Sequence, residues 1–208
     1  MRQKVRQKNH WPFLTLIGIS IYLILYIVAA SYYPGGSNFN KSQVGFQWLS
    51  NYWCELLGEY SKNGFINKAR PIALVGMLFL STSISIFWIQ FPNLLVLNKL
   101  SRRIIQFCGV LSMIFFSLIF TEFHDLLIGL AVLFGAIAFI LTIYFFYKLG
   151  NSKIYLFGTI CLILVAFNNL IYLFDYLIDF LPIIQKITFI SIFIWISAIT
   201  IYVSKKLS

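Results

Sequence analysis

A short polar turn between two long apolar stretches carries the residues best suited to chemistry. It holds Glu122, His124 and Asp125 within four positions, so their side chains are expected to lie close together. A histidine beside a carboxylate can act as a general base or as a single metal ligand. Asp125 also precedes an apolar run, where an aspartate can cap the N-terminus of a helix. The turn therefore predicts either a catalytic site or a helix cap.

A second polar set begins within the fifth apolar run and continues past its end. Its members recur at i, i+4, i+7 and i+11, a spacing that places them on one helical face: Asn168, Tyr172, Asp175 and Asp179. Asn168 lies deep in the run, so its amide needs a partner inside the protein. The two aspartates repel each other, so a cation, a proton or Lys186 is expected near them. The set predicts a ligand-binding or cation-binding site; alternatively, the asparagine bridges helices and both aspartates are solvated.

The longest hydrophilic segment, residues 34–70, contains a third set. Apolar residues recur there at helical spacing: Leu49, Tyr52, Trp53, Leu56 and Tyr60. Glu55 and Glu59 lie on the opposite stripe, together with Asn51. This pattern predicts an amphipathic helix over residues 47–60 that lies flat at a membrane interface. Such a helix is either a lid packed over the protein or an element that turns Glu55 and Glu59 toward its interior.

The count of possible ligands limits the metal chemistry. The chain has two histidines, which excludes a zinc site built from several of them. An oxygen-only site for Ca²⁺ or Mg²⁺ remains open, and its five candidate ligands are Glu55, Glu122, Asp125, Asp175 and Asp179. The sequence contains no GxSxG, HExxH, P-loop or dinucleotide-binding pattern, so no cofactor is indicated with certainty.

The elements that must position these residues are membrane-spanning helices. Of the 208 residues, 60% are hydrophobic and 11% are charged, whereas soluble domains carry about 25% charged residues. A helix needs about 20 apolar residues to cross a bilayer, and six runs qualify: 11–33, 71–90, 104–120, 126–147, 154–174 and 187–204. These runs are too long for the strands of a barrel. The predicted fold is all-α, a polytopic six-transmembrane-helix bundle in a single membrane domain over 1–208.

The distribution of basic residues predicts the orientation. With both termini in the cytoplasm, eleven basic residues lie inside: Arg2, Lys4, Arg6, Lys8, Lys99, Arg102, Arg103, Lys148, Lys153, Lys205 and Lys206. Five lie outside: Lys41, Lys62, Lys68, Arg70 and Lys186. This excess agrees with the positive-inside rule, and all six acidic residues then lie outside. The net charge of +10 follows from these flanking residues, which meet lipid headgroups. Membrane lipids are the expected partners, and nucleic acid is not.

The outer segment also carries a resemblance to a known family. Its motifs are Tyr33-Pro34-Gly35-Gly36, Gly45-Phe46, Asn51-Tyr52-Trp53-Cys54-Glu55-Leu56, and Asn63-Gly64 with Asn67. Together they resemble a bacterial six-span family known as domain of unknown function 998, which is similar in outline to the eukaryotic Frag1/DRAM/Sfk1 membrane proteins. Cys54 stands where that family has a serine, and Glu55 stands where it has an aspartate. The resemblance implies a six-helix bundle in a bacterial inner membrane and supplies no activity.

Three functions remain open on these grounds. The first is an accessory or lipid-interacting membrane protein with a polar acidic pocket at the outer face, whose partners are lipids and other membrane proteins. The second is a hydrolase-like enzyme of the outer leaflet that uses His124 and carboxylates. The third is a small proton-coupled or cation-coupled transporter. Convergence of the polar residues in one pocket would favour the enzyme, and a polar chain across the bilayer would favour the transporter. Separate, solvated acids would favour the accessory protein.

Overall fold

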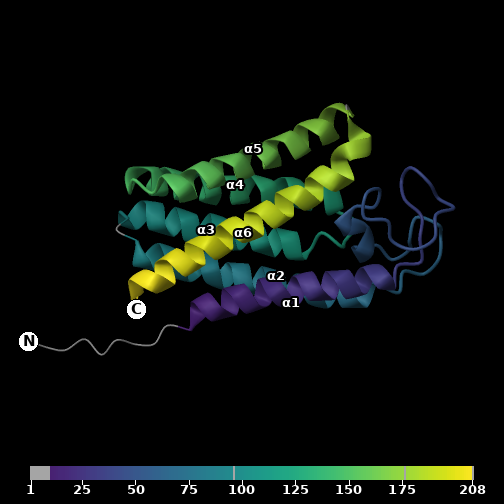
Figure 1. Cartoon of the computed structure of the whole chain (residues 1–208), viewed down its shortest axis with the longest axis horizontal. Coiled ribbons are helices and arrows are strands. Elements are labelled where there is room, and N and C mark those ends of the chain that lie inside the picture. Colours follow the sequence, from purple (N-terminus) through teal and green to yellow (C-terminus); the bar gives the residue numbers. More distant parts are fainter. Residues whose placement is uncertain (1–9, 96, 176, 208) are drawn as a thin grey trace, which may run out of the picture.

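Six long helices make up most of the molecule (Figure 1). The computed structural model describes residues 10–207 except 96 and 176. The long helices are α1 (Trp11–Ser31), α2 (Arg70–Gln90), α3 (Lys99–Ser117), α4 (His124–Lys148), α5 (Ser152–Phe174) and α6 (Leu181–Leu207). Short 3₁₀ helices cover η1 (Trp53–Leu57), η2 (Phe91–Leu94) and η3 (Ile178–Phe180). Six helices in the described chain are long and apolar enough to cross a membrane, so the predicted all-α six-helix fold is confirmed.

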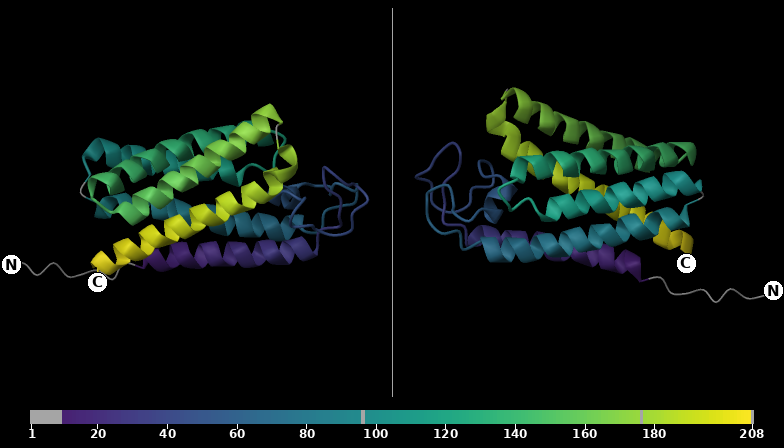
Figure 2. Two further views of the ribbon diagram at one scale, coloured as in Figure 1. Left: turned by 45° about the horizontal axis from the view of Figure 1, so that its top comes forward. Right: turned by 180° about the vertical axis from the view of Figure 1, so that it is seen from behind.

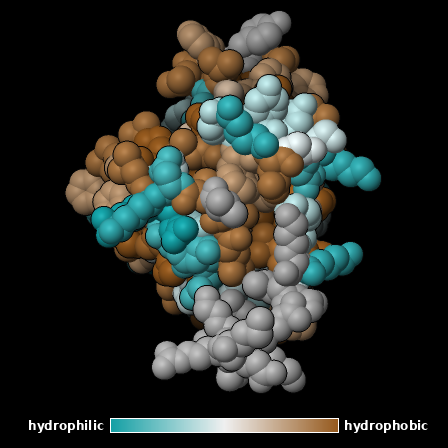
Figure 3. Space-filling view, turned by 90° about the vertical axis from the view of Figure 1, so that its left-hand side faces the viewer, coloured by the Kyte–Doolittle hydropathy of each residue, from teal (hydrophilic) through white to brown (hydrophobic). Residues whose placement is uncertain are grey.

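The bundle has two chemically different ends. The segment over 32–69 joins α1 to α2 and protrudes at one end, called here the loop end (Figures 1 and 2). The start of α1 and the end of α6 lie at the opposite end, called here the terminus end, which Figure 3 views face on. All six acidic residues lie in the loops and helix ends of the loop end: Glu55, Glu59, Glu122, Asp125, Asp175 and Asp179.

Basic residues flank the helices at the terminus end. They are Lys99, Arg102 and Arg103 in the first turns of α3, Lys148 at the end of α4, Lys153 at the start of α5, and Lys205 near the end of α6. Arg2, Lys4, Arg6 and Lys8, which also enter the topology prediction, lie outside the described residues, as does the side chain of Lys206.

The helices follow one another around the bundle, and α1 also packs against α6. Half of the α2 span is buried, against 17% of the α4 span and 22% of the α5 span. The α3 span is also 22% buried. Since buried helices form the core and exposed ones face lipid, α3, α4 and α5 present most of their surface to the membrane.

Small residues allow close approach between neighbouring helices. A Cβ atom added to Gly109 on α3 would lie 2.3 Å from Cγ of Trp88 on α2. A Cβ atom on Gly158 of α5 would lie 2.7 Å from Nε1 of Trp195 on α6. That indole nitrogen donates to the backbone oxygen of Ile154 at 2.8 Å. Such contacts bring helices together in lipid, where the hydrophobic effect between them is absent.

The prediction of an amphipathic helix over 47–60 is wrong. The chain forms a turn at 48–50 and the short helix η1. The residue predicted to lie on the polar stripe, Asn51, is fully buried, whereas Leu49 on the apolar stripe is exposed. Asn51 Oδ1 accepts a hydrogen bond from Gln47 N at 2.8 Å. This side-chain bond competes with the helical backbone pattern.

Two span boundaries also differ from the prediction. Helix α3 covers Lys99–Ser117 rather than 104–120, because Asn98 caps its N-terminus by accepting from Ser101 N at 2.7 Å. Helix α6 begins at Leu181 rather than 187. Pro182 lies in its first turn, where the missing N–H costs nothing. Lys186, predicted to lie in an outer loop, is therefore part of α6.

Candidate functional site

The polar turn before α4 holds one exposed pair. His124 Nδ1 lies 2.9 Å from Asp125 Oδ1, and the Asp125 side chain is 75% exposed. Glu122 is also exposed. Helix α4 begins at His124, with Phe123 at its N-cap and no side-chain cap bond. The prediction that Asp125 caps this helix is therefore wrong; its carboxylate lies in the first turn, where it interacts favourably with the helix dipole.

The polar stripe predicted along the fifth helix is interrupted. Helix α5 ends at Phe174, and Asp175 adopts a left-handed backbone with φ of 53°. Asp179 lies in η3, beyond the reversal of the chain. The prediction that both aspartates share one helical face with Asn168 is therefore wrong, because the turn into α6 uses these residues. Both aspartates are exposed.

Asn168 joins two helices inside the bundle. Its Nδ2 donates to Leu164 O at 2.9 Å and to the Thr188 hydroxyl on α6. Asn168 Oδ1 is buried and has no hydrogen-bond partner among the described residues. Tyr172, one turn further along α5, is exposed, and its hydroxyl interacts with the Asp125 carboxylate of α4. These contacts are bridges between helices.

The ionisable residues buried at the loop end form a network centred on Asn51. Lys186 is 8% exposed, and its Nζ donates to Asn51 O at 2.5 Å and to Pro182 O at 2.9 Å. Glu55 is 7% exposed, and its Oε2 accepts from Asn51 Nδ2 at 2.5 Å. Lys186 is one of the three groups expected near Asp175 and Asp179, together with a cation or a proton; its ammonium group donates to the loop segment and to Pro182 O instead.

The two glutamates predicted to lie on one stripe have different environments. Glu55 Oε1 is buried without a hydrogen-bond partner in the described part of the chain. Glu59 has a side chain that is 72% exposed and lies 3.8 Å from Arg70. Of the two glutamates, only Glu55 therefore points into the protein. The alternative that turns both of them toward the interior holds for Glu55 alone.

Burial dominates the electrostatics of this network. It raises the pKa of Glu55 above its ordinary value, and the hydrogen bond from Asn51 and the nearby Lys62 offset part of the rise. Burial also raises the pKa of Cys54 to about 11. A thiol with such a pKa is protonated at neutral pH, whereas the thiolate is the nucleophile. Cys54 is therefore poorly suited to nucleophilic attack.

The predicted ligands do not come together as a metal site. No group of three His, Cys, Asp or Glu side chains within the described residues could hold a metal ion. Five buried hydroxyls within the spans bond to backbone carbonyls: Thr15, Ser83, Ser112, Thr142 and Thr200. Ser81 Oγ is buried without a hydrogen-bond partner among the described residues. The described spans thus contain local polar contacts rather than a chain of polar side chains linking the two ends.

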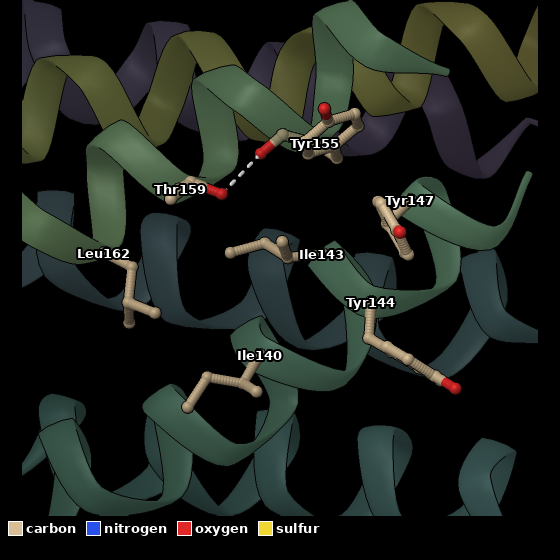
Figure 4. Close-up of a pocket in the computed structure, with 7 residues that line it drawn as sticks. All are labelled: Ile140, Ile143, Tyr144, Tyr147, Tyr155, Thr159 and Leu162. Atoms are coloured by element: carbon tan, nitrogen blue, oxygen red, sulfur yellow. Dashed lines mark hydrogen bonds between the residues drawn. The ribbon is translucent and has the colours of Figure 1, made fainter. Parts of the chain in front are cut away.

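A groove that the sequence motifs did not indicate lies between α4 and α5 (Figure 4). Its volume is about 310 Å³, and its lining is mainly apolar. The lining residues are Ile140, Ile143, Tyr144 and Tyr147 from α4, with Tyr155, Thr159 and Leu162 from α5. On each helix the lining residues recur at i, i+3 or i+4 and i+7, so the sequence shows that they share a helical face. The sequence does not show that the two faces meet.

Comparison with known protein families, with curated proteins and with solved structures finds no match to this chain. The resemblance to the domain of unknown function 998 therefore stays a prediction. The fold and the site define a class: a six-span, multi-pass helical membrane protein with its acidic residues at one end.

Proposed function

We propose that this chain is an accessory integral membrane protein that binds membrane lipid at its helical surface and performs no chemistry of its own. The observation that carries the proposal is the apolar groove between α4 and α5, two of the three helices that leave most of their surface open to the membrane. Lipid chains pack against apolar grooves between helices without any polar group to orient them.

The arrangement of ionisable groups favours this function over an enzyme of the outer leaflet. General acid–base catalysis requires the acid and the base within hydrogen-bond reach of one substrate. His124 and Asp125 form an exposed pair, while the hydrogen bonds of Glu55 and Lys186 tie the loop to α6. These groups serve separate structural contacts, which gives the enzyme alternative less support.

The proposal includes a location and an orientation. Within the described helices the terminus end carries Lys99, Arg102, Arg103, Lys148, Lys153 and Lys205, whereas the loop end carries Arg70 and Lys186. Four further basic residues precede α1 in the sequence, and all the acidic residues lie at the loop end. By the positive-inside rule the terminus end then faces the cytoplasm. We place the protein in a bacterial inner membrane, with the loop end on the outer face.

Lipid extraction and native mass spectrometry of the purified full chain test this function. The wild-type protein is expected to retain phospholipid, and the lipid masses are expected to stay unchanged during prolonged incubation with Ca²⁺ or Mg²⁺. Release of a lysolipid or a free headgroup by the wild-type protein, abolished in His124→Ala, would establish the enzyme instead. A protein that retains no lipid of any class under mild detergent would overturn the lipid-binding function.

A further inference from the structure

We infer that the α4–α5 groove is a binding site for a glycerophospholipid with an anionic headgroup. One acyl chain would lie along the groove, and the phosphate would face Lys148 and Lys153 at the terminus end. This inference rests on the proposed lipid-binding function and names the site and the class of lipid.

The groove is graded from apolar to polar along its length. Ile140 and Leu162 line one end, whereas Tyr144, Tyr147 and Tyr155 gather at the other, as Figure 4 shows. Thr159 adds little polarity, because its hydroxyl donates to Tyr155 O at 2.9 Å. Tyrosine is enriched where the hydrocarbon meets the headgroups. The polar end of the groove therefore lies where a lipid headgroup would be expected.

Two lysines flank this polar end. Lys148 is the last residue of α4, and its Nζ lies 5.5 Å from the centre of the Tyr144 ring, which lines the groove. Lys153 is the second residue of α5, two positions before Tyr155. Both side chains are exposed. The Lys148 ammonium group is thus held beside the groove by a lining residue, and Lys153 adds a second positive charge at the same end of α5.

Charge complementarity identifies the occupant. Every Asp and Glu of the chain lies at the loop end, so neither lysine has an acidic side chain near it. A lipid phosphate supplies the missing counter-charge, and a basic residue near a membrane surface contributes about 1 kcal/mol to binding anionic lipid. The N-terminus of α5, whose helix dipole favours anions, points to the same end. The acyl chain of a zwitterionic lipid would also fit the apolar groove, but its headgroup would neutralise the lysines less well.

Binding of defined lipids to the full chain tests the charge assignment. The double variant K148Q/K153Q is compared with K99Q/K205Q, which removes two exposed lysines from the same end but outside the groove. Native mass spectrometry measures retention of phosphatidylglycerol and phosphatidylcholine. We expect K148Q/K153Q to lose about 30-fold in preference for phosphatidylglycerol, and K99Q/K205Q to keep the wild-type preference. An unchanged preference in K148Q/K153Q, or an equal loss in the control, would overturn the inference.

A second pair of variants tests the position of the chain. Thr159→Phe fills the groove, whereas Ile160→Phe places the same phenyl ring on the exposed neighbour that does not line it. We expect only Thr159→Phe to reduce retention of both lipids, with equal melting temperatures for the two variants. If Thr159→Phe instead dissociates a dimer and leaves lipid retention unchanged, a second copy of the chain covers the groove and the inference fails. If no variant and no wild-type sample retains lipid, the proposed function fails as well.

Discussion

Asn51 organises the loop end because each polar atom of its side chain, and its backbone oxygen, has a partner. Its side-chain oxygen accepts from Gln43 and Gln47, its amide nitrogen donates to Gly36 O and to Glu55, and its backbone oxygen accepts from a lysine on α6. Buried polar groups with partners cost little, whereas those without partners are destabilising. Glu55 is the residue of this network with one oxygen that has no partner in the described part of the chain.

The burial of the Glu55 carboxyl group makes the stability of the protein depend on pH. Burial raises the pKa of Glu55 in the folded protein above the ordinary value of 4.5, so the folded state binds a proton more tightly than the unfolded state. The contribution of Glu55 to stability is then greatest below pH 4.5, and it falls as the pH rises through the pKa of Glu55 in the folded protein. We expect Glu55→Gln, which cannot ionise but can still accept from Asn51, to lack this fall.

The measurement is the melting temperature in detergent, at several pH values from 4.5 to about 8. The difference between Glu55→Gln and the wild-type protein should become more positive as the pH rises and then level off. Lys186 and Lys62 face the same carboxylate, and both the wild-type protein and Glu55→Gln retain these lysines. Glu59→Gln is the matched control, since Glu59 is largely exposed, and its difference should vary little. A difference for Glu55→Gln that is flat or declines with pH would contradict the prediction.

At the scale of elements, close contacts between helices determine how the bundle packs. Gly109 on α3 faces Trp88 on α2 so closely that a Cβ atom would overlap the indole. Overpacking of this kind typically costs about 1–3 kcal/mol. We therefore expect Gly109→Ala to lower the free energy of unfolding by about that amount, measured by denaturation in mixed micelles.

Gly129 on α4 provides the matched control for this substitution. An added Cβ atom there meets nothing within 4 Å, so alanine relieves the entropy cost of a helical glycine without any clash. Gly129→Ala is expected to be neutral or to stabilise the protein by up to about 1 kcal/mol. Equal effects of the two substitutions would show that helix propensity, rather than the α2–α3 contact, controls stability at these positions.

The sequence predicted the elements that depend on local physics. Six apolar runs give six helices because their composition alone decides that they cross the membrane. The segment over 47–60 has helical periodicity as well, but its polar side chains bond to the backbone and to other loop residues. Asn51 and its neighbours therefore replace the expected helix with a compact loop. Periodicity cannot reveal this outcome, because several of the competing bonds involve residues outside the repeat: Gly36, Gln43 and Lys186.

The candidate site depended on contacts that no local pattern contains. The alternative that turns both Glu55 and Glu59 inward holds for Glu55 and fails for Glu59, which is largely exposed. The neighbours of Glu55 in the network were missed, since Lys186 and Asn51 are separated by 135 positions in the chain. The opposite error occurred at Asp175 and Asp179, where a helical repeat was extended past the end of α5. The sequence gives no helix-end signal after Phe174, because the residue with a left-handed backbone, Asp175, is an aspartate rather than a glycine.

At the scale of the whole molecule, charge separates the two ends of the bundle. The acidic residues of the loop end and the basic residues of the terminus end make the charge distribution asymmetric along the bundle. The proposed orientation and the proposed lipid site depend on each other. The lysines beside the α4–α5 groove meet the anionic cytoplasmic leaflet only if the terminus end faces the cytoplasm.

Cysteine labelling in intact cells tests this orientation directly. Cys54→Ala provides the background, because the other two cysteines, Cys108 and Cys161, are buried within helices. Lys41→Cys, exposed at the loop end, should react with a membrane-impermeant maleimide before the cells are opened. Lys99→Cys, exposed at the terminus end, should react only after permeabilisation. The reverse pattern would place the acidic end in the cytoplasm, and the lysines of the groove would then face the outer leaflet, where the electrostatic argument for an anionic lipid loses its basis.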